Sequence, residues 1–451
     1  MSAARDRAGR GGGLLATDFY QLTMLHAYEY AGMGDRATFE FFFRRPQPTR
    51  GFLLAAGLGT LAREIETAGF TPEEIAWLRE TGRFPDEMID RLAEWRFTGD
   101  LDAVAEGTLI FGDEPILRVE APIAEAQLIE TLVINHLHFQ TLIASKAARM
   151  VLTAPDAQLI DFGLRRAHGM EAGVRAARAA YLAGFAGTAT TSAGLAFAIP
   201  LYGTMAHSFI QAHDSEEQAF LDFALARPAD TTLLIDTYDT ERAAAKVVTL
   251  AETLRARGIA VRGVRIDSGD LAAHARAVRA ILDEGGLDDV RIVASGGIDE
   301  WTLRDLVRSG APIDSYGIGT SLTTSQDRPA IDCGYKLVAY AGTPRRKLSE
   351  GKVLWPGAKQ LFRHHGGDGT IDHDVLALAD EALDGEPLLR PAMREGRCLD
   401  LPTLEEARAT ARENLARLPD RLKDLDTPGD YDVRISSGLR ALADSMAKEG
   451  R

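Results

Sequence analysis

Cysteine is almost absent from this chain of 451 residues, which contains only Cys333 and Cys398. Two cysteines form no disulfide framework, so we expect the protein in the reducing cytoplasm. Neither cysteine has a metal-ligand spacing to a histidine, so we expect no structural zinc site. Long apolar runs are also missing, since the most apolar stretch, 193–203, is short and contains Pro200. A membrane-spanning helix needs about 20 predominantly apolar residues, so we expect no membrane role.

Excess positive charge is lacking as well, because the formal net charge is −15 at pH 7. Nucleic acid needs a positive surface field, so it is excluded as a partner. An anionic small molecule can still bind where Arg, Lys and backbone N–H groups gather, because salt screens the other acidic groups beyond about 8 Å. Residues 1–13 lack the apolar segment of a secretory signal and are expected to form a disordered tail.

Two nucleotide-binding motifs are missing. The sequence has no G-x-x-x-x-G-K-[ST] loop, so any ATP must bind without a Walker A site. It also has no G-x-G-x-x-G between a strand and a helix, which argues against a dinucleotide oxidoreductase.

What the sequence does contain, from about 158 to 340, is a repeated alternation of short apolar runs and amphipathic segments. In 241–257 and 271–286 the apolar residues recur every three or four positions, as in helices that bury one face. Strands that alternate with helices build parallel βαβ units, so we predict the α/β class and an irregular (β/α) barrel. The predicted strands are 158–161, 199–203, 231–236, 261–267, 290–295 and 314–319.

A polar residue or a glycine stands where several of these strands stop. In (β/α) barrels the active site is built from the loops at the carboxyl ends of the strands, so we expect these residues to face one shared pocket. The alternative is that they are ordinary turn residues. They are Asp161, Asp236, Asp267, Ser295 and Gly319.

The segments before and after the barrel mix helix and strand patterns, and we predict that they fold together into a second α/β domain. Residues 17–32 predict a helix in which Asp18 and Gln21 have capping-box spacing. Further predicted elements are a strand at 37–46, a long helix at 125–150, strands within 336–365 and a helical tail from about 403. The predicted divisions are the tail at 1–13, an N-terminal domain at 14–120, the barrel at 121–340 and a C-terminal segment at 341–451.

His207 is the sharpest candidate for catalysis. It lies in YGTMAHSFIQAHDS (202–215), and an imidazole with a pKa near 6.5 can act as base, acid or nucleophile at neutral pH. A lone histidine is also common in a protein core. His213 lies six residues further on, which is not a helical metal pair, so we assign no metal-ligating residues.

Arginines and carboxylates follow two of the predicted strands. Arg165 can grip a carboxylate or phosphate in bidentate fashion, and Phe162 beside it offers an aromatic face to a flat ring. Arg265, Asp267 and Asp270 surround a Ser-Gly turn, where carboxylates suit a ribose diol or Mg²⁺ and the guanidinium suits an anion. The alternatives are a packed Phe with surface arginines, and an Asx turn without a ligand.

Two glycine-bearing loops follow the last two barrel strands, in ASGGID (294–299) and YGIGTS (316–321). Barrels commonly hold phosphate through backbone N–H groups of such late loops, where glycine lets the chain approach closely. Glycine also serves plain turns. The candidate phosphate-binding residues are Ser295, Gly296, Gly297, Gly317, Gly319 and Thr320.

Seven short motifs, taken in order from about residue 14 to about 365, resemble those of nicotinate phosphoribosyltransferases, which are type II phosphoribosyltransferases. The resemblance implies an irregular barrel with an added α/β domain, and a homodimer with composite active sites. It also implies the conversion of nicotinate and 5-phosphoribosyl 1-pyrophosphate to nicotinate mononucleotide and pyrophosphate in NAD salvage, coupled to ATP hydrolysis with Mg²⁺. The motifs are TDFYQLTM, IDFGLRRAHG, GTMAHS, RIDSGD, ASGGID, YGIGT and KLSEGKVLWPGAKQLFR.

The resemblance assigns the pyridine substrate to four residues. Tyr20 would contact nicotinate in the neighbouring subunit's site, Thr204 and Arg265 would contact the ring and its carboxylate, and Phe162 would lie on the ring face. Ala189 stands where nicotinamide-using relatives carry an acid, which favours nicotinate because two carboxylates would repel each other.

The phosphorylated substrates are assigned in the same way. Arg165 and Asp267 would handle phosphoribosyl pyrophosphate, and Gly297, Gly319 and Thr320 would hold its 5-phosphate. His207 matches the autophosphorylated histidine of the family, so ATP would add about two negative charges beside the site.

Three other readings stay open from the sequence. Nicotinamide phosphoribosyltransferase is the nearest enzymatic alternative, and a quinolinate enzyme would be a shorter chain without the histidine motif. A catalytically inactive sugar-phosphate binding protein would use the same barrel. Leu354, before WPG, departs from the polar residue expected there, which puts a contact from that loop in doubt.

Overall fold

The computed structural model describes residues 13–44, 50–349 and 352–448, so the predicted tail lies outside the described residues except for Gly13. The chain forms two compact units. The first comprises 1–145 and 330–451, and the second 146–329. The predicted barrel, 121–340, therefore extends beyond the second unit at both ends. The chain passes from the first unit to the second at residues 145 and 146, which lie within helix α6 (Glu130–Thr153).

An antiparallel sheet forms the centre of the first unit, and it draws its strands from both ends of the chain. β1 pairs with β5 on one side and with β12 on the other, from Ala37 opposite Tyr340 to Phe43 opposite Cys333. The strand order is β13-β12-β1-β5-β3-β19-β20. The bounds are β1 Arg36–Phe43, β3 Asp100–Val104, β5 Pro115–Pro122, β12 Cys333–Tyr340, β13 Thr343–Pro344, β19 Leu389–Arg394 and β20 Arg397–Cys398.

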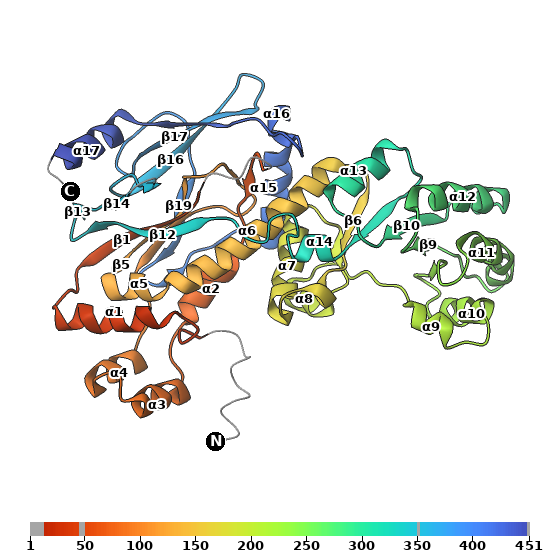
Figure 1. Cartoon of the computed structure of the whole chain (residues 1–451), viewed down its shortest axis with the longest axis horizontal. Helices are drawn as coiled ribbons and strands as arrows, with labels where there is room; N and C mark the ends of the chain where they lie inside the picture. The colour runs from red at the N-terminus through yellow and green to blue at the C-terminus, as the bar shows by residue number, and fades with distance from the viewer. Residues whose placement is uncertain (1–12, 45–49, 350–351, 449–451) are drawn as a thin grey trace. The chain divides into compact units, whose positions relative to one another are not determined.

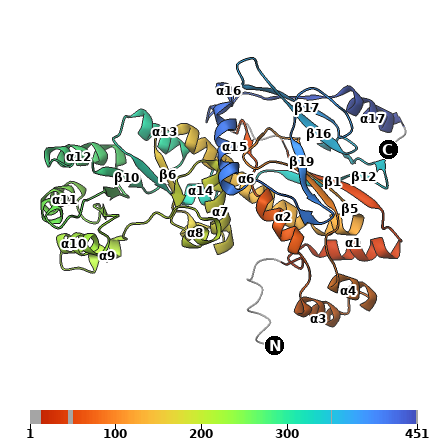
Figure 2. The same ribbon diagram turned by 180° about the vertical axis from the view of Figure 1, so that it is seen from behind.

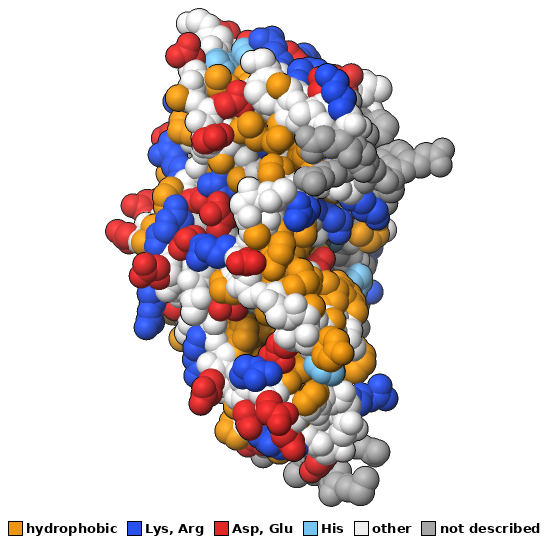
Figure 3. All heavy atoms as spheres, turned by 90° about the vertical axis from the view of Figure 1, so that its left-hand side faces the viewer, with side chains coloured by type: hydrophobic (Ala, Val, Ile, Leu, Met, Phe, Trp, Pro, Cys, Tyr) orange, Lys and Arg blue, Asp and Glu red, His pale blue; other side chains and the backbone are white. Residues whose placement is uncertain are grey.

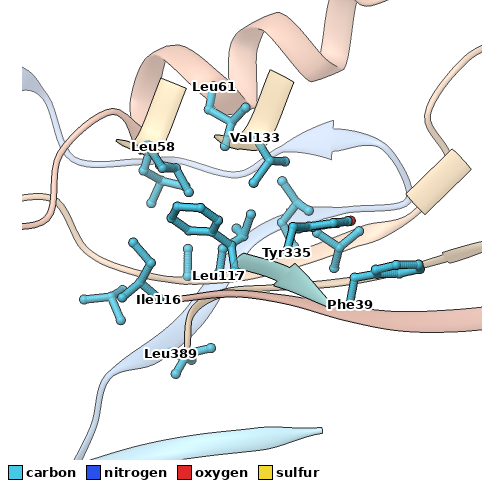
Figure 4. Close-up of a cluster of buried hydrophobic side chains, with 14 of the residues drawn as sticks. Phe39, Leu58, Leu61, Ile116, Leu117, Val133, Tyr335 and Leu389 are labelled. Atoms are coloured by element: carbon cyan, nitrogen blue, oxygen red, sulfur yellow. The ribbon is translucent and has the colours of Figure 1, made fainter. Parts of the chain in front are cut away.

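Aromatic and aliphatic side chains from this sheet and from helices α2 (Leu58–Thr67) and α6 form one buried core (Figure 4). The rings of Phe39 and Tyr335 stack with centroids 4.9 Å apart. Leu61 and Val133 contribute from the helices and are fully buried. Each such side chain contributes about 1.5–3 kcal/mol on removal from water, so the pairing of β1 with β12 is held by packing as well as by hydrogen bonds.

A four-stranded sheet, ordered β18-β16-β17-β21, completes the first unit and contains a buried charged cluster. Arg363 donates to both oxygens of Asp374, at 3.0 and 2.7 Å, and Tyr431 donates to Asp374 at 3.0 Å. Glu114 is buried beside them, and burial together with the charge of Asp374 raises its pKa well above the ordinary value. The bounds are β16 Lys359–His365, β17 Ile371–Leu378, β18 Glu386–Pro387, β21 Asp432–Ile435, with helices α15 Leu404–Ala416 and α17 Ser437–Lys448.

The second unit is a parallel α/β structure, as predicted. Its strand order is β7-β6-β11-β10-β9-β8, and each neighbouring pair is parallel. Helices α11 and α12 lie side by side, and α12 packs against β9 and β10 (Figures 1 and 2). Within the described ranges no ladder joins β8 to β7, and on its outer side β7 makes a single bridge, between Thr188 and Leu201. The bounds are β6 Gln158–Asp161, β7 Gly187–Thr188, β8 Thr232–Leu234, β9 Gly263–Ile266, β10 Arg291–Ser295, β11 Ser315–Ile318, α7 Met170–Ala183, α11 Thr240–Arg255, α12 Leu271–Glu284 and α13 Glu300–Arg308.

Some local predictions were wrong. Residues 199–203 do not form a strand. Their β pairing is limited to one bridge, between Leu201 and Thr188 of β7. Asp18 precedes α1 (Phe19–Tyr30) but makes no side-chain capping bond. The helix expected at 125–150 is two helices, α5 (Ile123–Leu128) and α6. The helical tail is confirmed, since α15 begins at a capping box formed by Thr403 and Glu406.

Lys146 and Glu300 form the centre of a buried charged cluster in the second unit. The Lys146 ammonium lies 2.6 Å from both Glu300 and Asp327, and Arg149 lies 3.2 Å from each of the same two carboxylates. Glu300 is the first residue of α13, so the cluster fixes the start of the helix that follows β10. Among the described helices none is long and apolar enough to span a bilayer.

Candidate active site

Asp267 is the junction of three loops at the carboxyl ends of neighbouring strands. Its backbone N–H donates to Oδ2 of Asp236 at 3.0 Å, and the hydroxyl of Ser268 donates to the same oxygen at 2.6 Å. Its own Oδ1 accepts from Ser295 Oγ at 2.5 Å. The loops after β8, β9 and β10 are therefore tied together by hydrogen bonds to carboxylates, which are stronger than neutral ones.

His207 lies beside this junction. It is the first residue of the short helix α9 (His207–Gln211), and its side chain is 38% exposed. Nε2 lies 3.9 Å from Oδ2 of Asp267, and Nδ1 lies 3.1 Å from Oγ1 of Thr237. A half-exposed imidazole with one nitrogen near a carboxylate and the other on a hydroxyl is suited to nucleophilic or acid–base chemistry.

Arg265 is the cation of the site. Its Nη1 donates to Thr204 Oγ1 at 2.7 Å, and its Nε is buried without a hydrogen-bond partner in the structure. Burial lowers the pKa of Arg265, the charges of Asp267 and Asp236 oppose this, and the charge of Arg165 adds to it. A guanidinium with an unpaired donor next to a second arginine favours an anionic ligand at this place.

Phe162 packs against the backbone of β11. A Cβ added to Gly317 would lie 2.4 Å from the Phe162 ring, so only glycine permits this contact. A Cβ added to Gly319 would lie 3.3 Å from the carbonyl oxygen of Phe162. Phe162 is half-buried, and Arg165, three residues later, is exposed in the 3₁₀ helix Leu164–Arg166. Gly317 of β11 thus leaves the space that the aromatic side chain occupies.

The loop after β10 contains two glycines with different roles. Gly296 has φ +93°, and a Cβ there would lie 2.0 Å from the carbonyl oxygen of Asp267. Gly297 has φ +66°, and its Cβ position is surrounded by open space. Ser321 donates to the carbonyl of Ile298 at 2.5 Å, which joins this loop to the loop after β11. The predicted phosphate-binding loops are therefore neighbours.

Thr320 is exposed at the start of the short helix α14 (Thr320–Thr323), directly after Gly319. The hydrogen bond from Ser321 brings this helix start close to the Gly296–Gly297 turn. Ser295 is buried, and its hydroxyl is used by Asp267 rather than pointing outward.

Asp161 does not face the pocket, contrary to the prediction for the strand-ending residues. It is 1% exposed, and its two oxygens accept from the N–H of Gly163 at 2.8 Å and from Thr188 at 2.7 Å. Burial raises its pKa. Asp161 therefore supports the turn after β6 and joins it to β7.

Thr237 and Asp236 take part in the site but were not assigned to it from the sequence. Asp236 was noted only as a strand-ending residue, and Thr237 not at all. The available signal was position, since both lie within three residues of the end of β8, at the same edge of the sheet as Asp267. Which of several residues in such a loop turns inward depends on backbone geometry that the sequence pattern does not contain.

Tyr20 belongs to the first unit, whereas the other predicted site residues belong to the second. It lies on α1, and its hydroxyl donates to Glu130 at 3.1 Å. Burial and the charge of Glu130 raise the pKa of Tyr20 to about 12, so it stays protonated at neutral pH. A cavity of about 310 Å³ in the same unit, lined in part by Arg50, Phe111 and Tyr431, contains none of the predicted site residues.

Comparison with known proteins decides the family. A nicotinate phosphoribosyltransferase of Mycobacterium tuberculosis is 47% identical over 432 residues, which are 95% of this chain and 92% of that protein. The chain belongs to the nicotinate phosphoribosyltransferase family. The family's N-terminal domain matches 15–138, its central region 157–345 and its C-terminal domain 382–443. The last match extends the likeness beyond the region in which motifs were found.

Further relatives agree with this assignment to the family. A nicotinate phosphoribosyltransferase of Bacillus subtilis is 36% identical, with 94% of this chain and 92% of that protein covered. The crystal structure of the human nicotinic acid phosphoribosyltransferase is similar with a TM-score of 0.87 at 30% identity, covering 95% of this chain and 99% of that one. A nicotinate-nucleotide pyrophosphorylase from Pyrococcus furiosus, 22% identical with a TM-score of 0.71, shares the fold.

Proposed function

We propose that this chain is a nicotinate phosphoribosyltransferase, which joins nicotinate to phosphoribosyl pyrophosphate and yields nicotinate mononucleotide and pyrophosphate for NAD salvage. The observation that carries the proposal is the group of His207, Asp267 and Arg265 beside a glycine turn at the carboxyl ends of parallel strands. This group occurs in a chain 47% identical to a nicotinate phosphoribosyltransferase.

Arg265 and Thr204 are the proposed binding residues for nicotinate. The guanidinium is held by Thr204 at 2.7 Å and keeps a buried Nε donor, which the substrate carboxylate would satisfy. Phe162 would lie on the face of the pyridine ring. Ala189 leaves no acidic side chain at the position where one would repel the carboxylate.

The sugar phosphate is assigned to the neighbouring loops. Arg165 would bind its phosphate oxygens, and the amide-rich turns at Gly297 and Gly319, with Thr320, would hold the 5-phosphate. Asp267 would orient the ribose. The transfer breaks the bond from C1 to pyrophosphate and forms the bond to the pyridine nitrogen. Positioning and charge stabilisation are the main contributions of the protein to an oxocarbenium-like transition state.

His207 is the proposed acceptor of the γ-phosphoryl group of ATP, which makes the enzyme ATP-dependent. Phosphorylation would add negative charge between the Thr237 hydroxyl and the Asp267 carboxylate and thereby shift the loops that carry them. Hydrolysis of the phosphohistidine would then be coupled to the formation and release of the mononucleotide.

Mg²⁺ is the proposed metal, and the carboxylates present fit it. In the described part of the chain no group of three or more His, Cys, Asp or Glu side chains could hold a metal ion. Mg²⁺ needs only one or two carboxylates when phosphates supply the other ligands. Asp267 and Asp236 are the two candidates, because Oδ1 of Asp236 is buried without a hydrogen-bond partner. The ion would neutralise phosphate charge.

A cytoplasmic homodimer with composite sites is the proposed assembly. Tyr20 would reach the site of the partner subunit from α1, whose Phe19, Tyr20 and Tyr30 are 48%, 45% and 91% exposed. On the side of the first unit seen in Figure 3, hydrophobic side chains gather between charged ones. An exposed apolar area of this kind is typical of a surface that is covered by a partner.

The proposal is tested by measuring product formation from nicotinate, nicotinamide and quinolinate, each with and without ATP. We expect nicotinate to be the preferred substrate and ATP to increase its conversion. Preference for nicotinamide would replace the substrate assignment. Binding of phosphoribosyl pyrophosphate without any turnover or labelling by ATP would identify an inactive sugar-phosphate binding protein.

A further inference from the structure

The structure assigns a role to a residue outside the predicted site. We infer that Thr237 is a positioning residue that occupies Nδ1 of His207, so that Nε2 is the nitrogen that accepts the phosphoryl group of ATP. This inference rests on the proposed phosphorylation of His207 and goes beyond it by naming the reacting atom and the residue that selects it.

Thr237 is held in place by the sheet. It follows Asp236, whose carboxylate is fixed by the Asp267 N–H and the Ser268 hydroxyl. Ile235 is tied to the backbone carbonyl of Arg265 at 3.1 Å. The Thr237 hydroxyl is therefore a rigid partner for the imidazole, whereas His207 begins a helix of only five residues. The hydrogen bond at 3.1 Å restrains the ring against rotation about its Cβ–Cγ bond.

The two ring nitrogens have different surroundings. Nδ1 lies within hydrogen-bond distance of Thr237, while Nε2 lies 3.9 Å from Asp267, which is longer than a hydrogen bond. In the tautomer with hydrogen on Nδ1, this N–H donates to Thr237 Oγ1 and Nε2 keeps a lone pair on the side of Asp267. The Thr237 hydroxyl can accept this N–H, whereas Asp267, at 3.9 Å, lies too far from Nε2 to hold a proton there by a hydrogen bond, so the tautomer with hydrogen on Nδ1 is favoured.

The proton stays in place during the transfer. The Nε2 lone pair forms a bond to the γ-phosphorus, the bond from this phosphorus to the bridging oxygen breaks, and ADP leaves with the electron pair. Nδ1 keeps its hydrogen, which is donated to Thr237 throughout. The positive charge that develops on the ring is shared with this N–H, so the hydrogen bond strengthens as the N–P bond forms.

Two variants separate this role from a structural one. Thr237→Val keeps the shape but removes the acceptor, and we expect the rate of labelling by γ-phosphate-labelled ATP to fall about tenfold or more. Thr237→Ser keeps the hydroxyl and should restore labelling to within about threefold of the wild-type rate. Thr231→Val is the matched control, because its buried hydroxyl binds the Arg227 carbonyl at 2.9 Å at the opposite end of β8. It should label at the wild-type rate.

The second readout is the phosphohistidine isomer, which is determined on the wild-type full-length chain. Wild-type protein is labelled with ATP and examined with isomer-specific antibodies and ³¹P NMR under alkaline denaturing conditions. We expect phosphorus on Nε2. Phosphorus on Nδ1, or equal labelling of Thr237→Val and wild type, overturns the inference while leaving the proposed function intact. Absence of an acid-labile label on wild type overturns the inference together with the proposed phosphorylation of His207.

Discussion

The hydroxyl of Ser295 donates to Oδ1 of Asp267 over 2.5 Å, which links the carboxyl ends of β10 and β9. The same aspartate lies 3.9 Å from His207 through its other oxygen. One oxygen of the Asp267 carboxylate is therefore held by the buried Ser295, and the other lies near the half-exposed imidazole of His207. The orientation of Asp267 is set before any ligand binds, which is the condition for effective positioning of a substrate.

Ser295→Ala should lower kcat/KM for phosphoribosyl pyrophosphate about tenfold to a hundredfold. A hydrogen bond to a charged group contributes about 1.5–3 kcal/mol, and its loss lets the Asp267 carboxylate rotate. Steady-state kinetics with varied phosphoribosyl pyrophosphate measures the change. Ser309→Ala is the control, because the hydroxyl of this serine donates to the Leu306 carbonyl at the end of α13 and not to a carboxylate. Unchanged kinetics in Ser295→Ala would show that the orientation of Asp267 is unimportant.

Gly296→Ala and Gly297→Ala should differ although the residues are adjacent. The first places a Cβ 2.0 Å from the Asp267 carbonyl oxygen and must displace backbone. The second meets nothing within 4 Å and carries only the cost of a positive φ, about 1–2 kcal/mol. We expect Gly296→Ala to lose activity and melt earlier, and Gly297→Ala to melt only slightly earlier. Thermal unfolding and activity are measured together, and an equal fall in melting temperature in both variants would contradict the turn geometry.

Arg265→Lys should raise KM for nicotinate by more than about tenfold while the protein remains folded. A lysine keeps the charge but loses the planar guanidinium. In Arg265 this group donates to Thr204 through Nη1 and has Nε available for the substrate. Thr204→Val should give a smaller increase, since the guanidinium remains. KM values from initial rates with varied nicotinate test the order of the effects. An equal KM in Arg265→Lys and wild type would remove Arg265 from the binding of the carboxylate.

Glu114→Gln should change how stability depends on pH. Burial and the charge of Asp374 raise the pKa of Glu114, so the folded protein keeps a proton that the unfolded chain releases above about pH 4.3. The stabilisation due to this proton is fully present below that pH and is lost as the pH rises through the folded-state pKa. Glutamine does not titrate, and its amide can still accept from the N–H of Phe111 and donate to Asp374.

The free energy of unfolding of Glu114→Gln, relative to wild type, should therefore increase as the pH rises from about 4.5 to 8.5. Urea unfolding at a series of pH values gives this difference. Glu94→Gln, at an exposed residue after α4 (Asp86–Ala93), is the matched control for the loss of a carboxyl group. A difference for Glu114→Gln that does not change with pH would mean that Glu114 is ionised in the folded protein.

Sequence periodicity was sufficient for the parallel unit. Helices α11 and α12 and strands β9 to β11 follow from apolar residues at regular spacing, because each of these elements buries one face or two. It failed at 199–203, whose apolar run contains Pro200. Proline has no N–H for a ladder. Its carbonyl accepts from the N–H of Thr188 at 3.0 Å and the N–H of Tyr202 donates to the Thr188 carbonyl at 3.0 Å, so the segment pairs with β7 in a single bridge rather than as a strand.

Long-range pairing could not be read from the sequence. Nothing local in β1 specifies that its partner is β12 rather than another strand, since the choice depends on packing such as that of Phe39 on Tyr335. The site shows the same division. The positions of Asp161 and Asp267 at the carboxyl ends of their strands were predictable, but Asp161 is buried and bonds to Thr188 of β7, whereas Asp267 lies beside His207. That difference arises from the turn each residue forms.

The middle position of β1 in its sheet has a consequence for synthesis of the chain. Ribosomes add about 5–20 residues per second and N-terminal regions usually fold first. Here one neighbour of β1, strand β12, emerges only after the whole of 146–329 has been made. During that interval one hydrogen-bonding edge of β1 has no partner strand. The phenylalanines of β1 therefore stay available to chaperones until β12 has been made.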